Sequence, residues 1–342
     1  MARSELITGT TEAGLSIGDH KFIDSLSDKG RESLAFYFQK AFSRKSVNTQ
    51  RAYKTDLAAY VAFCEEYAPN APLFLSEQTQ MRDRIDAYID AMIEQHNYKK
   101  ATLQRRLNIL RTLLGVMDVA NPFENKGYAD YFNARLTMDL PVEQQAQAKP
   151  FKEDDLIRVN KRRTIDALGL RNLTMLNVAF DSLLRASELA QVQWTHIDEH
   201  LQTLLVPRSK SNRGERLDYR SLSKTTLSYL RKLKEATPTS AKYVFNALVN
   251  TDDILVNVTP LSYQSVYHGL MGAMEWGGLN SALFSAHSTR VGAALSMREK
   301  GISLSAIAEA GGWRSLDMVR RYLQAIDARH SGSSQLAAMS GR

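Results

Sequence analysis

Apolar side chains recur at intervals of three and four through most of the first 140 residues, a spacing typical of helices that bury one face. The pattern predicts helices over 30–43, 48–66, 77–95, 101–117 and 124–138. The clearest is 48–66, where Asn48 stands at an N-cap position. Its apolar stripe consists of Tyr53, Leu57, Tyr60, Val61 and Cys64. We therefore expect a helical bundle over 29–140, preceded by a flexible arm over 1–28.

The pattern changes near residue 140. A polar, Gln-rich stretch with prolines at its ends predicts a linker over 141–150. Beyond it the sequence predicts helices over 151–160, 169–184, 223–235, 260–275, 287–300, 303–310 and 315–325, and short strands over 193–197, 203–207 and 216–221. We expect Ser303 and Ser315 at N-caps and Gly301 and Gly311 at C-caps. The predicted fold class is mainly α: a helical N-terminal domain and an α-rich C-terminal domain with a small antiparallel β-sheet.

Composition narrows the class of protein. No run of about eighteen apolar residues predicts a membrane span, and the first residues lack the apolar core of a secretory signal. The single cysteine, Cys64, excludes an intrachain disulfide and fits a small buried side chain. The seven histidines are scattered, so we expect no metal site. These features suggest a reducing, intracellular compartment.

The net charge of +7 suits a polyanionic partner, and the positions of the basic residues strengthen that interpretation. Segment 99–111 contains basic residues and no acidic ones, namely Lys99, Lys100, Arg105, Arg106 and Arg111. A solvated helix normally mixes both signs, so a phosphate-facing helix is favoured over a plain surface helix. Arg51 and Lys54 extend the basic character to the helix over 48–66, and a third basic cluster lies over 208–220.

Three short stretches carry candidate chemistry. Arg185 follows an apolar helix and has Glu188 one turn later. His287 and Arg290 share a face at the start of a helix, where an anion is favoured. Trp313 and Tyr322 lie in the last helical region, with Arg320 and Arg321 beside the tyrosine. Each stretch alone also fits an ordinary structural role: an ion pair, a capping histidine, or a packed aromatic ring.

Their order and combination resemble the tyrosine recombinase (phage integrase) family. The segments LLRASELAQV, AHSTRVGAA and AGGWRSLDMVRRYL are especially similar to its Cre-type branch. The resemblance spans nearly the whole chain and is strongest over 183–192 and 285–323. It implies a helical core-binding domain over 29–140, a catalytic domain over 151–325 and a tail over 326–342 that docks on a neighbouring subunit.

The resemblance also implies a role for each candidate residue. Arg185 and Arg290 would hold the scissile phosphate with charge-assisted bonds, and His287 and Trp313 would add hydrogen bonds to it. Tyr322 would attack the phosphorus and form a 3′-phosphotyrosyl linkage, which conserves the bond energy, so no ATP is required. Glu188 would orient the site. A lysine would protonate the leaving 5′-oxygen; Lys210 matches best and Lys224 is its rival.

The family's DNA contacts transfer by position. The candidates are Thr49, Arg51, Lys54, Lys100, Gln104, Arg105, Gln264 and Tyr267. The expected partners are double-stranded DNA with an inverted-repeat site and three further copies of this chain, which complete a homotetramer on two duplexes. We expect no cofactor, no metal and no small-molecule substrate, and a cytoplasmic location at a bacterial nucleoid or plasmid. Two other functions stay open: a type IB topoisomerase-like swivel, and a non-catalytic sequence-specific DNA-binding protein.

Overall fold

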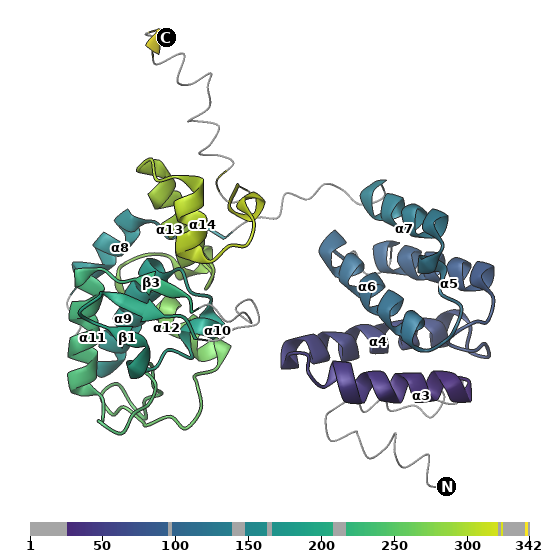
Figure 1. Ribbon diagram of the computed structural model, residues 1–342, viewed down its shortest axis with the longest axis horizontal. Helices are drawn as coiled ribbons and strands as arrows, with labels where there is room; N and C mark the ends of the chain where they lie inside the picture. The colour runs from purple at the N-terminus through teal and green to yellow at the C-terminus, as the bar shows by residue number, and fades with distance from the viewer. Residues whose placement is uncertain are drawn as a thin grey trace. The chain divides into compact units, whose positions relative to one another are not determined.

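The computed structural model describes residues 26–94, 98–138, 148–162, 166–207, 217–320, 323 and 339–340. The chain separates into two compact units, Met1–Gln144 and Gln145–Arg342 (Figure 1). Helices dominate both units, and the strands form one small antiparallel sheet in the second, so the predicted fold class is confirmed. None of the helices within these ranges has the length and apolarity needed to cross a bilayer.

The first unit is a helical bundle. Its helices are α3 (Asp28–Tyr37), a π-helical turn (Phe38–Phe42), α4 (Val47–Tyr67), α5 (Gln78–Glu94), α6 (Lys100–Val116), a 3-10 turn (Pro122–Glu124) and α7 (Lys126–Met138). The predicted helices occur with ends shifted by a few residues. The predicted cap at Asn48 is wrong, because Ser46 caps α4 and accepts from the Thr49 N–H. The serine hydroxyl closes the first turn one residue before α4 begins.

An apolar core fills this bundle. Tyr60 is 1% exposed and donates its hydroxyl to the Leu73 carbonyl at 3.0 Å. Cys64, one turn along α4, is 2% exposed and forms no disulfide. The same helix buries Asp56, whose two carboxylate oxygens accept from Arg105 of α6 at 2.8 Å each. Nε of Arg106, the next residue of α6, lies 3.5 Å from Oδ1 of the same carboxylate.

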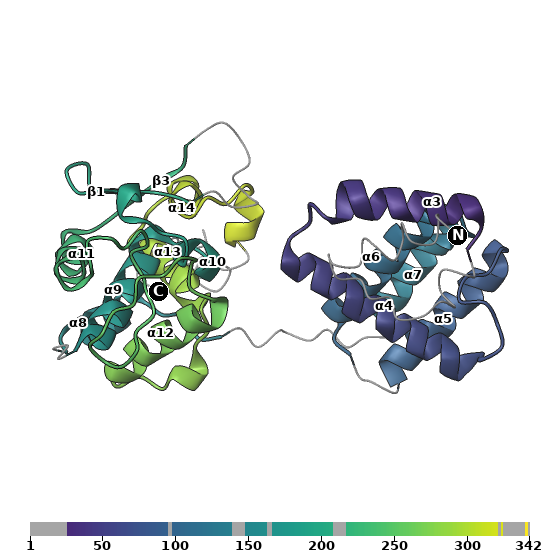
Figure 2. The same cartoon turned by 90° about the horizontal axis from the view of Figure 1, so that it is seen from below.

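The second unit is built around α9 (Ala167–Ser182), a helix buried on nearly every side. Figure 2 shows the other helices arranged around it. They are α8 (Glu153–Asn160), α10 (Ala186–Leu189), α11 (Lys224–Ala236), α12 (Tyr263–Trp276), α13 (Ser288–Glu299) and α14 (Leu304–Gly311), and residues 316–320 are also helical. Because α11, α12 and α13 all pack on α9, the residue that ends α9 lies close to several elements.

The sheet of the second unit has the order β1 (Ile197–Asp198), β2 (Thr203–Leu205), β3 (Tyr219–Ser221), with both pairs antiparallel. The strand predicted over 193–197 is mostly wrong, because Trp194–His196 forms a 3-10 turn. The Gln193 N–H donates to Nδ1 of His196 at 3.1 Å and closes that turn. Leu204 pairs with Arg220 across β2 and β3, so Arg220 occupies a buried position of the sheet.

Glycines follow the two helices next to the last two candidate motifs: α13, which begins at the His287–Arg290 motif, and α14, which leads to Trp313. Gly301 follows α13 with φ of +80°, and Gly312 ends α14 with φ of +60°. The cap predicted at Gly311 therefore lies one residue later, because Gly311 is still helical. Ser303 caps α14 as predicted, accepting from the Ala306 N–H at 3.2 Å. The left-handed turn at Gly312 directs the chain back toward the body of the unit.

Candidate active site

The site begins where α9 ends. Leu183 adopts a left-handed conformation with φ of +51°, which costs an L-residue about 1–2 kcal/mol. Its side chain is fully buried, and this packing holds the chain in the strained turn. The turn reverses the chain so that Arg185 becomes the N-cap of the short helix α10.

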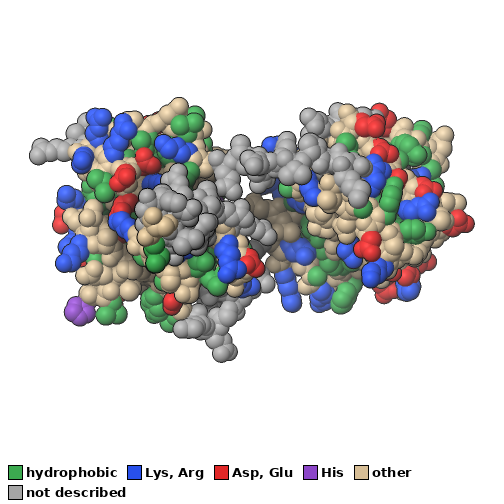
Figure 3. All heavy atoms as spheres, turned by 90° about the horizontal axis from the view of Figure 1, so that it is seen from above, with side chains coloured by type: hydrophobic (Ala, Val, Ile, Leu, Met, Phe, Trp, Pro, Cys, Tyr) green, Lys and Arg blue, Asp and Glu red, His purple; other side chains and the backbone are tan. Residues whose placement is uncertain are grey.

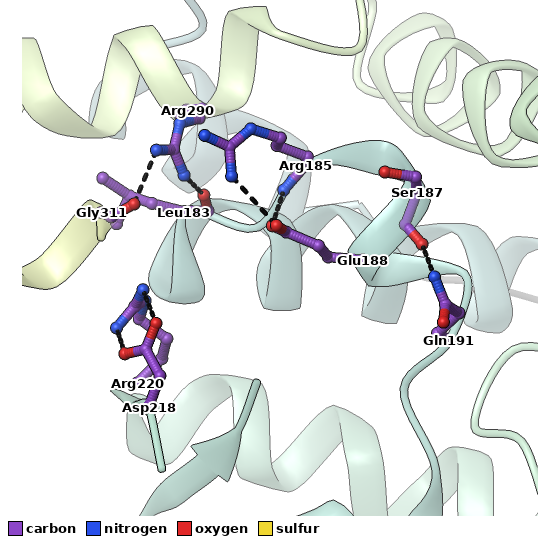
Figure 4. A network of polar contacts seen from close by, with 9 residues as sticks. All are labelled: Leu183, Arg185, Ser187, Glu188, Gln191, Asp218, Arg220, Arg290 and Gly311. Atoms are coloured by element: carbon purple, nitrogen blue, oxygen red, sulfur yellow. Dashed lines mark hydrogen bonds and ion pairs between the residues drawn. The ribbon is translucent and has the colours of Figure 1, made fainter. Parts of the chain in front are cut away.

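Arg185 and Glu188 form a paired unit at that turn. The Glu188 carboxylate accepts from the Arg185 main-chain N–H at 2.9 Å and from its Nη1 at 3.0 Å (Figure 4). Glu188 is buried, whereas the Arg185 side chain is 38% exposed. The carboxylate therefore fixes one edge of a guanidinium that still reaches solvent, a suitable arrangement for binding an anion.

Arg290, in the first turn of α13, is held from two directions. It is 2% exposed. Its Nη1 donates to the Leu183 carbonyl and its Nη2 to the Gly311 carbonyl, the latter at 2.6 Å (Figure 4). The guanidinium also lies over the Trp313 ring, 4.1 Å from the ring centroid. These contacts join the end of α9, the end of α14 and the start of α13 around one cation.

His287 lies at the N-cap of α13. His287 is exposed by its surface area, yet neighbouring protein atoms remove part of the hydration of its ring. This burial, followed by the positive charges of Arg290 and Arg185, lowers the pKa of His287 below its ordinary value of 6.5. The imidazole is therefore neutral at neutral pH. The bond from Arg290 to the Leu183 carbonyl, two residues before Arg185, shows that the two basic motifs, far apart in sequence, lie close together.

The structure thus brings together five of the predicted site residues: Arg185, Glu188, His287, Arg290 and Trp313. Lys210 and Tyr322, the predicted acid and nucleophile, lie outside the described residues. The neighbours Val319 and Leu323 are both fully buried. Lys224, the rival acid, is the exposed first residue of α11.

The predicted DNA-contact residues differ in how accessible they are. Arg51 and Gln264 are exposed, and Lys54 and Tyr267 are half-buried. Figure 3 shows basic side chains on both units over the face drawn, with acidic ones among them.

Four of these side chains already have partners within the protein. The Thr49 hydroxyl bonds to that of Ser46, and the Lys100 ammonium donates to Thr137. Gln104 donates to Asn108, and Arg105 uses two nitrogens on Asp56. Arg105 therefore has a structural contact in addition to any contact with DNA.

One pair beside the site, Asp218 and Arg220, was not predicted from the sequence. In the sequence, Arg220 is recognisable only as a member of the basic cluster over 208–220. In an extended segment, the Asp-x-Arg spacing places both side chains on one face. This spacing is the sequence feature that could have indicated the pair. Figure 4 shows this pair beside the Arg290 cluster.

Comparison with known proteins agrees with this geometry. Residues 150–329 match the phage integrase family. The chain is 24% identical over 338 residues to recombinase Cre of Escherichia phage P1, covering 89% of this chain and 92% of that protein. It is 23% identical over 290 residues to tyrosine recombinase XerC of Pediococcus pentosaceus, covering 83% and 88%. A structure of the XerH site-specific recombinase bound to a palindromic difH substrate shares the fold, with a TM-score of 0.58, 16% identity and 91% of each chain covered. The chain therefore belongs to the phage integrase family, as a tyrosine recombinase.

Proposed function

We propose that this protein is a site-specific DNA recombinase that cleaves and rejoins DNA at inverted-repeat sites through a 3′-phosphotyrosyl intermediate. The observation that carries the proposal is the cluster formed by Arg185, Arg290 and His287. It combines two guanidinium groups, each fixed by protein contacts, with an imidazole whose pKa they help to lower. Such a cluster suits a phosphodiester that gains negative charge as it reacts.

The two arginines would act on the non-bridging oxygens of the phosphate. Arg185 presents an edge to solvent while Glu188 holds the other edge. Arg290 is kept in place by main-chain carbonyls, which orient its charge without cancelling it. A cation fixed before the substrate arrives requires little reorganisation in the transition state, which is why such groups accelerate the reaction.

The bond changes balance without a cofactor. The Tyr322 oxygen attacks the phosphorus as its hydroxyl proton passes to solvent, the bond to the 5′-oxygen breaks, and Lys210 supplies the proton that the 5′-oxygen takes. Rejoining reverses each step: a 5′-hydroxyl returns its proton to Lys210 and attacks the phosphotyrosyl phosphorus, and the tyrosine oxygen leaves and takes a proton from solvent. One ester replaces another in both directions, so no nucleotide is consumed. A neutral His287 would donate a hydrogen bond to the phosphate.

The partner in this proposal is duplex DNA. The XerH recombinase is bound to a difH substrate and a lambda integrase dimer is bound to a COC′ core site, and the basic helix α6 of this chain would supply a phosphate-binding surface in the first unit. We further propose that four copies act on two duplexes and that the 326–342 tail links them in a ring.

Covalent capture tests the proposal. Wild-type protein and Tyr322→Phe are incubated with DNA of the source cell and its plasmids and denatured rapidly, and the protein-linked DNA ends are sequenced. Wild type should yield ends clustered at one inverted-repeat site, and Tyr322→Phe should yield none while retaining DNA binding. Tyr67→Phe is the matched control, because Tyr67 is an exposed tyrosine at the end of α4.

The other outcomes identify the competing functions. Ends scattered without a shared sequence indicate a topoisomerase-like swivel. Specific binding without any linked DNA indicates a non-catalytic DNA-binding protein. Linked DNA from Tyr322→Phe at the wild-type level shows that another residue is the nucleophile.

A further inference from the structure

An ion pair lies beside the site: Arg220 is buried in strand β3, and Asp218, which directly precedes that strand, is 31% exposed. Arg220 is 7% exposed, and its Nη2 donates to Oδ2 of Asp218 at 2.7 Å. Its Nη1 donates to the other carboxylate oxygen and to the Tyr219 carbonyl. The guanidinium is thus held against its own strand by a two-pronged contact. Nε of Arg220 is buried and finds no acceptor among the described residues, although a buried donor without a partner costs about 1–3 kcal/mol.

The pair packs against the turn that follows α14. A Cβ atom placed on Gly312 would lie 2.3 Å from Nη2 of Arg220 and 3.4 Å from Oδ2 of Asp218. Gly312 also has φ of +60°, a conformation that favours glycine, and a side chain at this position would have to displace the Arg220 guanidinium. On the preceding residue, a Cβ at Gly311 would lie 1.9 Å from the Trp313 ring. In this turn, Arg220 therefore lies against Gly312, and the Trp313 ring lies against Gly311.

That same turn holds Arg290. The Gly311 carbonyl accepts from Nη2 of Arg290 at 2.6 Å, and the Trp313 ring lies 4.1 Å from the guanidinium. A shift of the Gly311–Trp313 turn would move an acceptor and an aromatic face together. Contacts can thus be followed from Asp218 to Arg220, from Arg220 to the turn, and from the turn to Arg290.

We infer that Asp218 and Arg220 are positioning residues for the phosphate-binding arginine Arg290, acting through the Gly311–Trp313 turn. We assign Arg220 no direct role at the phosphate because the Asp218 carboxylate neutralises its charge, whereas Arg290 is held by uncharged main-chain carbonyls. The catalytic part of this inference rests on the proposed recombinase function. Its structural part, the coupling of β3 to the turn, does not.

The structural part is tested without DNA. The chain has three tryptophans, so 5-fluorotryptophan labelling gives three ¹⁹F signals, and Trp313→Phe identifies that of Trp313. Arg220→Gln and Asp218→Asn should shift or broaden the Trp313 signal and leave those of Trp194 and Trp276 in place. Arg231→Gln is the matched control, because Arg231 pairs with Glu199 at 2.7 Å on the exposed surface of the same unit. An unchanged Trp313 signal in both variants would overturn the inference.

The catalytic part uses the site recovered by covalent capture, as a duplex that carries either a normal phosphodiester or a neutral methylphosphonate at the scissile position. On the phosphodiester, both variants should cleave about 10- to 100-fold more slowly than wild type, since a small misplacement of a catalytic group has costs of that order. On the methylphosphonate, which carries less negative charge, the loss should shrink to about threefold or less.

The comparison separates positioning from folding. A variant that is merely less folded loses the same factor on both substrates, and that result would overturn the catalytic part, as would unchanged cleavage of the phosphodiester. Binding to the duplex should stay within about twofold of wild type, because a positioning residue makes no direct phosphate contact. If covalent capture recovers no site, the recombinase proposal fails, while the ¹⁹F result still decides whether β3 positions the turn.

Discussion

Arg290 is a cation whose surroundings are organised to orient it. Two carbonyls from distant segments and one indole ring face fix the guanidinium plane. Only a planar, forked donor can reach both carbonyls at once, so arginine cannot be exchanged for lysine here without loss.

Arg290→Lys should therefore keep the positive charge and lose the orientation. We expect cleavage of the recovered site to slow by about 10²–10³-fold, the range for removing one oriented donor from an anionic transition state. Single-turnover cleavage assays measure this, with DNA binding followed in parallel. Arg158→Lys is the control, since Arg158 also donates to a carbonyl, that of Gly278, but at the surface. Equal losses in both variants would contradict the special role of Arg290.

The pKa of His287 offers a second test at this scale. In the folded protein it lies below 6.5, because of burial and the charges of Arg290 and Arg185. The unfolded chain therefore takes up a proton at this residue before the folded chain does, and the contribution of His287 reduces stability as the pH falls below about 6.5. An NMR titration of the ring should give a pKa below 6.5, and Arg185→Gln should raise it. A pKa at or above 6.5 in the free wild type would contradict the arrangement.

Local spacing made part of the site predictable. Arg185 with Glu188, and His287 with Arg290, are neighbours along one chain segment, so sequence alone could suggest each pair. The contact between Arg220 and Gly312 joins a strand to a distant turn and depends on a left-handed glycine, which no periodicity reveals. Lys210 and Tyr322 stay predictions, because both lie outside the described residues.

At the scale of elements, hydrophobic spacing predicted the helices well, because each has one face in a core. Helix ends were less predictable, since they depend on single hydrogen bonds such as that from Thr49 to the Ser46 hydroxyl. The strand predicted over 193–197 failed for a similar reason, since the bond to His196 favours a turn. Short-range apolar content does not distinguish such a turn from a strand.

Helix α13 depends on one glycine for its packing. A Cβ at Gly292 would lie 1.7 Å from the Phe151 carbonyl oxygen, and the Phe151 N–H donates to Ser288 at the start of the helix. Gly292→Ala must push this main chain away and should lower the free energy of unfolding by about 1–3 kcal/mol, as measured by urea denaturation. Gly115→Ala, in α6, has only an ordinary contact at 3.4 Å and should be neutral or stabilising. Equal stability of Gly292→Ala and wild type would contradict the close approach.

At the scale of the molecule, the chain consists of two units, and the proposal gives each a share of the DNA contacts. Affinity for DNA should fall steeply with salt, because bound phosphates release counterions. Lys100→Ala and Arg111→Ala, both on α6, should each reduce the slope of log affinity against log salt by about 1.

Two further variants complete this measurement. Lys126→Ala, at the exposed start of α7, should leave the slope unchanged. Arg105→Ala should lower the stability of the first unit in addition to any effect on the slope, because Arg105 pairs with the buried Asp56. Fluorescence anisotropy with a labelled duplex gives the slopes. Identical slopes for all four variants and wild type would place the phosphate contacts elsewhere.

Because the chain has a single thiol, and that thiol lies in the first unit, the opening of this unit can be measured by thiol labelling. Cys64 is the one cysteine in the sequence and is closed inside the helical bundle, where burial raises the pKa of its thiol. A disulfide reagent such as Ellman's can reach it only when the bundle opens, so the labelling rate of the unmodified protein measures the free energy of that opening. The same rate, followed with and without DNA, would show how strongly binding closes this unit, with no dye or engineered residue.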